Sequence, residues 1–112
     1  MVNGDFFRWR NVWPKFADFF GLESGDVQQI DLELMMADKE LLWEDIVRRH
    51  DLIRTPFAEA AHWGYANYAF SPIFDVMLDN TKVRKHGFQE FADTEEMFVR
   101  IFESFRSQRF IP

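Results

Sequence analysis

Apolar residues recur at steps of three and four along most of the chain, which is the spacing of one face of an α-helix. The first such stretch predicts a helix over residues 9–20, ended by Gly21 in a left-handed conformation. Pro14 leaves two possibilities: the helix starts near Asn11 with Pro14 in its first turn, or Pro14 kinks it. The apolar positions of this helix are Trp9, Val12, Trp13, Phe16, Phe19 and Phe20.

Two further helical regions are predicted in the middle of the chain. A helical pattern begins at Asp31 and breaks near Asp38, where Asp38 would cap the next segment. Thr55-Pro56 is the sequence of an N-cap followed by proline at the first helical position. We therefore expect one helix from there to Ser71-Pro72, carrying Phe57, Ala60, Ala61, Gly64, Tyr65 and Tyr68.

The last third of the chain predicts one strand and two helices. Residues 73–78, Ile-Phe-Asp-Val-Met-Leu, have the β-branched and aromatic content of a short strand. Asp79, Asn80 or Thr81 would cap a brief helix ending at Gly87, and Asp93 with Glu96 forms a capping box for the last helix. The strand has no partner in the sequence, so either this assignment is wrong or its sheet lies in other residues or subunits.

Composition narrows the class of protein. With 112 residues, 47% hydrophobic and 29% charged, the chain has the size of one globular domain. It has no cysteine, which excludes disulfides, thiolate metal sites and a cysteine nucleophile. Its net charge of -6 argues against nucleic acid as a partner. No apolar run is long enough to cross a membrane and no signal peptide opens the chain, so we expect a cytoplasmic protein.

Sequence motifs give little support to catalysis by this chain alone. It contains no glycine-rich phosphate loop, no serine in a nucleophile elbow and no Tyr-x-x-x-Lys pair. Glu59 and His62 form a single Glu-x-x-His step, whereas a complete di-iron site needs two such steps and two more glutamates from facing helices. A surface glutamate beside a half-buried histidine is the better interpretation, and a small helical metal protein is the weakest of the alternatives. We predict no catalytic, cofactor-binding or metal-binding residue here.

Aromatic residues are the informative set. They make up 18% of the chain, with 14 Phe and 4 Trp. Most of them are expected in a packed core, yet they are numerous for a small helical core, so a hydrophobic pocket or a buried interface is a second interpretation. They gather in two groups: Phe6, Phe7, Trp9 and Trp13, and then Trp63, Tyr65, Tyr68, Phe70 and Phe74.

Several short sequence patterns occur in an order that is similar to a known family. They are Asn3-Gly4-Asp5-Phe6-Phe7-Arg8-Trp9, Trp13-Pro14, Phe20-Gly21, Met36-Ala37-Asp38-Lys39, Trp43, Ile46-Val47, His50, Asn80-Thr81-Lys82, His86-Gly87-Phe88, Phe91-Ala92-Asp93-Thr94 and Ile111-Pro112. In this order they resemble the C-terminal third of atypical extended short-chain dehydrogenases/reductases, an epimerase-like NAD(P)-binding family. Within it, they are most similar to the progesterone 5-beta-reductase and iridoid synthase group and its bacterial homologues.

This resemblance implies a function within a larger enzyme. Full-length members bind NADPH in an N-terminal Rossmann domain and reduce the carbon–carbon double bond of an activated enone or enal. Their cofactor loop, catalytic tyrosine and active-site lysine have no counterpart in this chain, which resembles the helical region that binds the substrate. The resemblance implies that Trp63, Tyr65, Tyr68 and Phe70 line the substrate pocket, with Tyr65 in the place of a phenylalanine and Phe7 and Trp9 beside the same cavity.

The residues and the resemblance together predict one fold and function, with one alternative function. We expect a mostly α fold, a helical bundle-like substrate-binding region with at most one or two short strands, forming a single domain over residues 1–112 of an α/β Rossmann-type enzyme. It would bind a hydrophobic small molecule for a reductase whose NADP(H) is held elsewhere, and would form a homo-oligomer through exposed aromatic surface. The alternative is a stand-alone helical module that binds a hydrophobic ligand or a protein partner.

Overall fold

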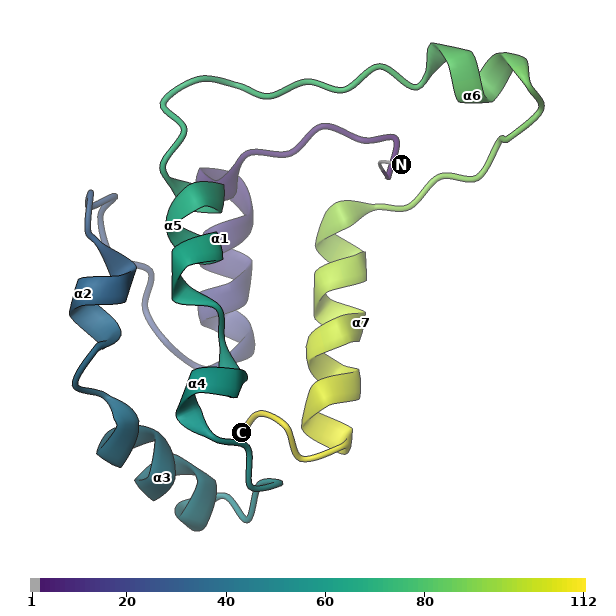
Figure 1. Cartoon of the computed structure of the whole chain (residues 1–112). Coiled ribbons are helices and arrows are strands. Elements are labelled where there is room, and N and C mark those ends of the chain that lie inside the picture. The colour runs from purple at the N-terminus through teal and green to yellow at the C-terminus, as the bar shows by residue number, and fades with distance from the viewer. Residues whose placement is uncertain (1–2) are drawn as a thin grey trace. The chain divides into compact units, whose positions relative to one another are not determined.

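The computed structural model describes residues 3–112, and every regular element among them is an α-helix (Figure 1). The mostly α fold expected from the sequence is confirmed. The helices are α1 (Trp9–Phe19), α2 (Leu32–Met36), α3 (Glu40–Arg49), α4 (Phe57–Ala60), α5 (Trp63–Phe70), α6 (Thr81–Lys85) and α7 (Thr94–Ser107).

Helix α1 closely follows its predicted bounds. It begins at Trp9, so Pro14 lies inside the helix and the start near Asn11 is wrong. Gly21 ends the helix with a φ of 67°, a left-handed conformation that glycine adopts without strain. The next residue then folds back, because the Leu22 backbone N–H donates to the Ala17 carbonyl at 2.8 Å and closes the last turn.

Two predicted features of the middle helices are wrong. Asp38 does not cap α3: Lys39 holds the N-cap position, and the Asp38 carboxylate instead accepts from the Lys39 ammonium. The single helix expected after Pro56 is broken into α4 and α5, because Ala61 adopts an extended conformation with φ -155° and ψ 145°. His62 then starts α5, where its Nδ1 accepts the Tyr65 backbone N–H at 3.1 Å.

The strand predicted over residues 73–78 is absent from the described part of the chain. These residues run as an open trace between α5 and α6 (Figure 1) and make no backbone hydrogen bond among residues 3–112. A strand exists only when a neighbouring strand accepts and donates along its edge, and no such neighbour lies within these residues.

The chain forms two compact units. The first contains residues up to 27 together with 74–101, and the second contains residues 28–73 together with 102–112. Only Val12, at 0%, and Leu52, at 8% exposure, are buried apolar residues in the described part of the chain. The packed core expected for most of the two aromatic groups is therefore wrong: Phe6, Phe7, Trp13, Tyr65, Tyr68, Phe70 and Phe74 are all exposed.

Candidate functional site

Asn67 joins α5 to the start of α2 within the second unit. Its Oδ1 accepts the Leu32 backbone N–H at 2.7 Å, and its Nδ2 donates to Asp31 Oδ1 at 3.0 Å. Asp31 is also the N-cap of α2, since the same carboxylate accepts the Leu34 backbone N–H at 3.1 Å. The hydrogen bonds from Asn67 and from Leu34 lower the pKa of Asp31, because both stabilise its charged form. One amide side chain thus fixes the packing of α5 on α2.

Gly64 lies on the same side of α5 as Asn67 and allows α2 to come close. A Cβ atom at this position would lie 3.0 Å from Glu33 Oε1 of α2. The two helices pack together through these positions. The contact holds Gly64 and Asn67 against α2, while Tyr65 and Tyr68 of the same helix stay exposed.

Tyr65 and Tyr68 are the most exposed of the candidate aromatic residues. Their exposed fractions are 67% and 74%, and their ring centroids lie 6.2 Å apart, as expected for positions three apart on a helix. Both phenol rings are thus presented together on the accessible side of α5. A surface of this kind offers apolar ring faces with two hydroxyl groups that can donate to, or accept from, a bound molecule.

Trp63 and Phe70 lie at the two ends of α5. The Trp63 ring packs near Phe57, with centroids 6.1 Å apart, while Phe70 is 43% exposed. The Trp63 indole nitrogen Nε1 is buried without a hydrogen-bond partner in the described part of the chain. A buried N–H donor without a partner is uncommon in folded proteins. The end of α5 that carries Trp63 therefore differs from the exposed middle of the helix.

Phe7 and Trp9, the two remaining candidates, belong to the first unit. Their rings meet edge to face with centroids 5.0 Å apart. The Trp9 ring also lies near the Phe98 ring of α7, with centroids 6.1 Å apart. Phe7 is 40% exposed, and Phe6 before it is 72% exposed. The six candidates are therefore divided between the units: Phe7 and Trp9 come together in the first, and the four residues of α5 lie in the second.

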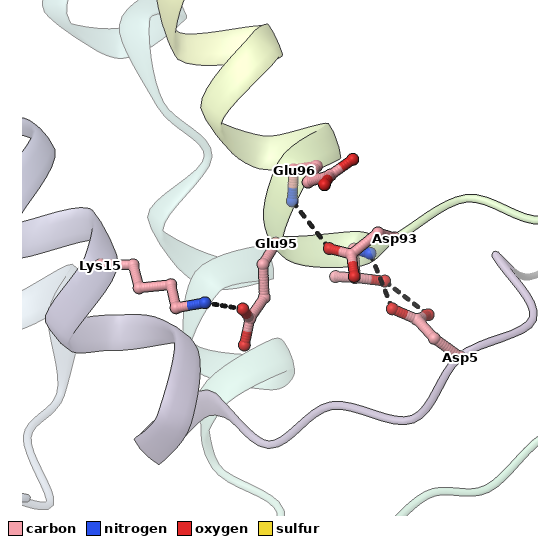
Figure 2. Close-up of polar contacts among 6 residues, drawn as sticks. Asp5, Lys15, Asp93, Glu95 and Glu96 are labelled. Atoms are coloured by element: carbon pink, nitrogen blue, oxygen red, sulfur yellow. Dashed lines mark hydrogen bonds and ion pairs between the residues drawn. The ribbon is translucent and has the colours of Figure 1, made fainter.

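The sequence gives no sign of how firmly the N-terminal loop is held to α7. Asp5 accepts two hydrogen bonds from Thr94, from its backbone N–H to Oδ2 and from its hydroxyl to Oδ1, each at 2.7 Å (Figure 2). Asn3 Nδ2 donates to the same Thr94 hydroxyl at 3.0 Å. Thr94 is 2% exposed, and its partner Asp5 lies 89 residues away in the chain. This distance in sequence is why local pattern reasoning missed it.

Carboxylates surround the N-terminus of α7. Asp93 accepts the Glu96 backbone N–H at 2.9 Å, so the predicted cap is confirmed, and Glu95 forms an ion pair with Lys15 of α1 (Figure 2). Negative charge near a helix N-terminus is stabilising, since the helix dipole is positive there. The Thr94 and Glu96 N–H groups at this end are thus already bonded by the protein's own side chains, and the local charge would repel a phosphate.

Two open depressions lie in the first unit. One is lined by Gly4, Asp5, Phe6, Met77, Leu78, Asp79, Asn80, Thr81 and Arg84, and the other by residues of α1 and α7. Neither contains any of the six candidate aromatic residues. In the described part of the chain, no group of three or more His, Cys, Asp or Glu side chains is arranged to hold a metal ion. His62 is also separated from Glu59 by the break at Ala61, so the half-motif does not lie on one helix.

Comparison with known proteins shows which enzymes this chain is similar to. The chain is 34% identical to the (S)-8-oxocitronellyl enol synthase of Catharanthus roseus, 32% to that of Antirrhinum majus and 29% to that of Nepeta cataria. Each match covers 98% of this chain and 29% of the relative, at the relative's C-terminal end. The predicted resemblance is confirmed. This chain is similar to the C-terminal part of enzymes of the iridoid synthase group. No family model matches it.

The matched relatives are much longer than this chain. It spans less than a third of their length, so the activity, substrate and partners of a complete relative do not pass to it by similarity alone. No helix among residues 3–112 is both long and apolar enough to span a membrane. What the chain shares with these enzymes is the sequence of their C-terminal part.

Proposed function

We propose that this chain is the substrate-binding portion of an NADPH-dependent short-chain reductase that acts on an activated C=C or carbonyl group of a hydrophobic small molecule. The observation that carries the proposal is the 34% identity to an (S)-8-oxocitronellyl enol synthase over 98% of the chain. The name of this relative refers to an enol of an 8-oxocitronellyl compound, a small molecule that carries an oxo group. The exposed rings of α5 suit such a ligand, since they offer apolar faces together with hydroxyl groups.

Tyr65 and Tyr68 would contact the substrate in this proposal. The ring faces would cover its hydrocarbon part, and the Tyr65 hydroxyl would donate a hydrogen bond to a carbonyl or hydroxyl group of the substrate and so orient it. Both rings are more than half exposed, so they are accessible without any movement of α5. The role is one of binding and orientation, since no motif for general acid–base or nucleophilic chemistry occurs in the chain.

In this proposal NADP(H) is bound outside this chain, whose sequence has no glycine-rich phosphate loop. Its diphosphate needs free backbone N–H groups and positive charge, usually from a glycine-rich turn at a helix N-terminus. Here the start of α7 is occupied by Asp5 and Asp93, and the start of α5 by His62. The proposal therefore assigns the cofactor and the hydride transfer to the part of a longer protein that corresponds to the unmatched region of the relatives.

A chimera tests the proposal. In it, the matched 114-residue C-terminal part of the Catharanthus roseus relative is replaced by this chain. We expect NADPH oxidation in the presence of a monoterpene enal. Tyr65→Phe is expected to raise KM about fivefold with kcat nearly unchanged, the effect of one hydrogen bond of about 1 kcal/mol made equally in the ground and transition states. Tyr68→Phe, which removes a hydroxyl from the neighbouring ring, is the matched control.

Two results would count against these assignments. A chimera that unfolds cooperatively and binds NADPH, but turns over no enal or enone, contradicts the proposed function. Unchanged kinetic constants in Tyr65→Phe contradict the role of that hydroxyl alone. The second candidate function is an independent module that binds an apolar ligand. It would be supported if the same enal, titrated into the isolated chain, quenches tryptophan fluorescence with a low dissociation constant.

Self-association of the isolated chain is a further expected outcome. Tyr65 and Tyr68 present neighbouring exposed rings on α5, and Phe70 is exposed at the end of the same helix. Exposed apolar surface is stabilised by burial against a second copy. Gel filtration with light scattering is expected to give a dimer or a larger oligomer at high concentration, and a double substitution, Tyr65→Ser with Tyr68→Ser, is expected to shift it toward monomer. A monomer at all concentrations would contradict the prediction.

A further inference from the structure

The open segment between α5 and α6 combines a strand-forming sequence with an unpaired backbone. None of the backbone N–H or C=O groups of residues 74–78 makes a hydrogen bond within the described part of the chain. The apolar side chains of this segment are also exposed: Phe74 by 70%, Val76 by 67%, Met77 by 69% and Leu78 by 58%. An extended run with both properties is a template for pairing with another strand.

The sequence of this segment suits a strand that is covered on both faces. With a period of two, Phe74, Val76 and Leu78 share one face, and Met77 shares the other with Asp75. Apolar residues on both faces are typical of strands inside a sheet covered on both sides, whereas a solvated edge strand alternates apolar and polar positions. Asp75 is the one charge in the run.

Arg8 neutralises that charge. Its Nη2 lies 2.5 Å from Asp75 Oδ2 and its Nε lies 3.1 Å from Asp75 Oδ1, a paired arrangement that also lowers the pKa of the carboxyl. A charge on a strand normally protects an open edge from pairing. Because this one is already paired within the first unit, it does not oppose the approach of a second strand.

An open depression lies beside the segment. Met77 and Leu78 form part of its lining, with Gly4, Phe6 and Arg84 from the neighbouring loop and from α6. These residues all belong to the first unit. The depression gives an incoming extended chain room along residues 77–79, and the apolar side chains at its border would be covered by one.

We propose that residues 74–78 pair as a β-strand with a strand from the part of the parent reductase outside these 112 residues. The proposal rests on the function proposed above. The relatives supply the reason for choosing this occupant: 114 matched residues are 29% of the Catharanthus roseus enzyme, so about 280 of its residues lie outside the match, enough for one or two domains. The partner is an edge strand of a sheet in that region.

Amide hydrogen exchange tests the pairing directly. In the isolated chain, the amides of residues 74–78 are expected to exchange at nearly the rate of an unfolded peptide. In the chimera with the Catharanthus roseus relative, the alternate amides that face the new strand are expected to exchange at least about 100-fold more slowly, as stable ladder hydrogen bonds require. The aligned amides of the intact relative are expected to show the same protection.

Two variants at position 76 distinguish a loss of strand pairing from general damage to the fold. Val76→Pro removes a backbone N–H and is expected to abolish the protection in the chimera, whereas Val76→Thr keeps the N–H and the branched shape and is expected to retain it. In the isolated chain neither should change the helical circular dichroism signal, because Val76 lies outside all described helices and makes no backbone hydrogen bond there.

The outcomes are distinguishable from those of the proposed function. Fast exchange of these amides in a folded, active chimera overturns the strand and leaves the function standing. Protection in a chimera without turnover supports the strand and contradicts the function. Protection that rises with concentration in the isolated chain makes a second copy the partner and overturns the proposal. If the chimera is insoluble, fast exchange in the aligned segment of the intact relative overturns it.

Discussion

Asp5→Ala is expected to lower the free energy of unfolding of the first unit by about 2–3 kcal/mol, the range for hydrogen bonds to a charged group whose partners stay buried. The substitution leaves the Thr94 backbone N–H and hydroxyl without their acceptor at a residue that is 2% exposed. It also removes a carboxylate from the positive end of α7. Thermal or urea unfolding followed by circular dichroism measures the loss.

Two control variants sharpen this prediction. Asp5→Asn keeps one acceptor oxygen in the same place. It is expected to lower the free energy of unfolding about half as much as Asp5→Ala does, because one hydrogen bond remains. Asp93→Ala removes only the exposed bond to the Glu96 N–H, so about 1 kcal/mol is expected for the loss of this cap. An Asp5→Ala protein as stable as Asp93→Ala would show that the long-range contact with the N-terminal loop does not hold α7.

Asn67→Asp is expected to reverse the pH dependence of the second unit. In the native chain the pKa of Asp31 is lowered, chiefly by Asn67, so its stabilisation is present above the usual aspartate pKa of about 4 and is lost as pH falls. The new carboxylate would meet Asp31 at the 3.0 Å separation now occupied by a hydrogen bond. Two ionised groups at that distance repel, so one of the two pKa values is raised and the pair is least stable at neutral pH.

Melting temperatures at several pH values measure this reversal. The native chain is expected to be more stable at pH 7 than at pH 4, and Asn67→Asp less stable at pH 7 than at pH 5, where one proton is shared between the two carboxyl groups. Asn67→Ala adds no charge and serves as the control: it should lose stability at every pH, with no reversal. A parallel pH dependence in Asn67→Asp and Asn67→Ala would show that Asp31 and residue 67 are apart in solution.

Local signals in the sequence predicted much of this fold. The left-handed stop at Gly21 and the cap at Asp93 depend only on residues within one turn, so their chemistry can be read from the sequence. Gly87 likewise follows α6 with a φ of 88°. The break between α4 and α5 was missed because nothing in the pattern marks Ala61 as extended, and a histidine is an unusual cap.

Contacts between distant residues could not be predicted in the same way. Asp5 reaches Thr94 across 89 residues, and Asn67 reaches Asp31 across 36. Neither pair has a spacing that a helix or a turn would impose. Of the candidate site, the sequence could place Tyr65 and Tyr68 together, since they are three positions apart on one helix. The assignment of all six aromatic residues to one pocket remains a prediction.

The ion pair between Arg8 and Asp75 has a consequence for how binding and assembly influence each other. Arg8 is the residue immediately before α1, next to Trp9, and Asp75 lies in the segment proposed to pair with an external strand. Any event that fixes the position of Asp75 thereby restrains the first turn of α1. If Trp9 contacts substrate, the two events are thermodynamically linked, and substrate binding changes the affinity of domain association by the same factor as association changes the affinity for substrate.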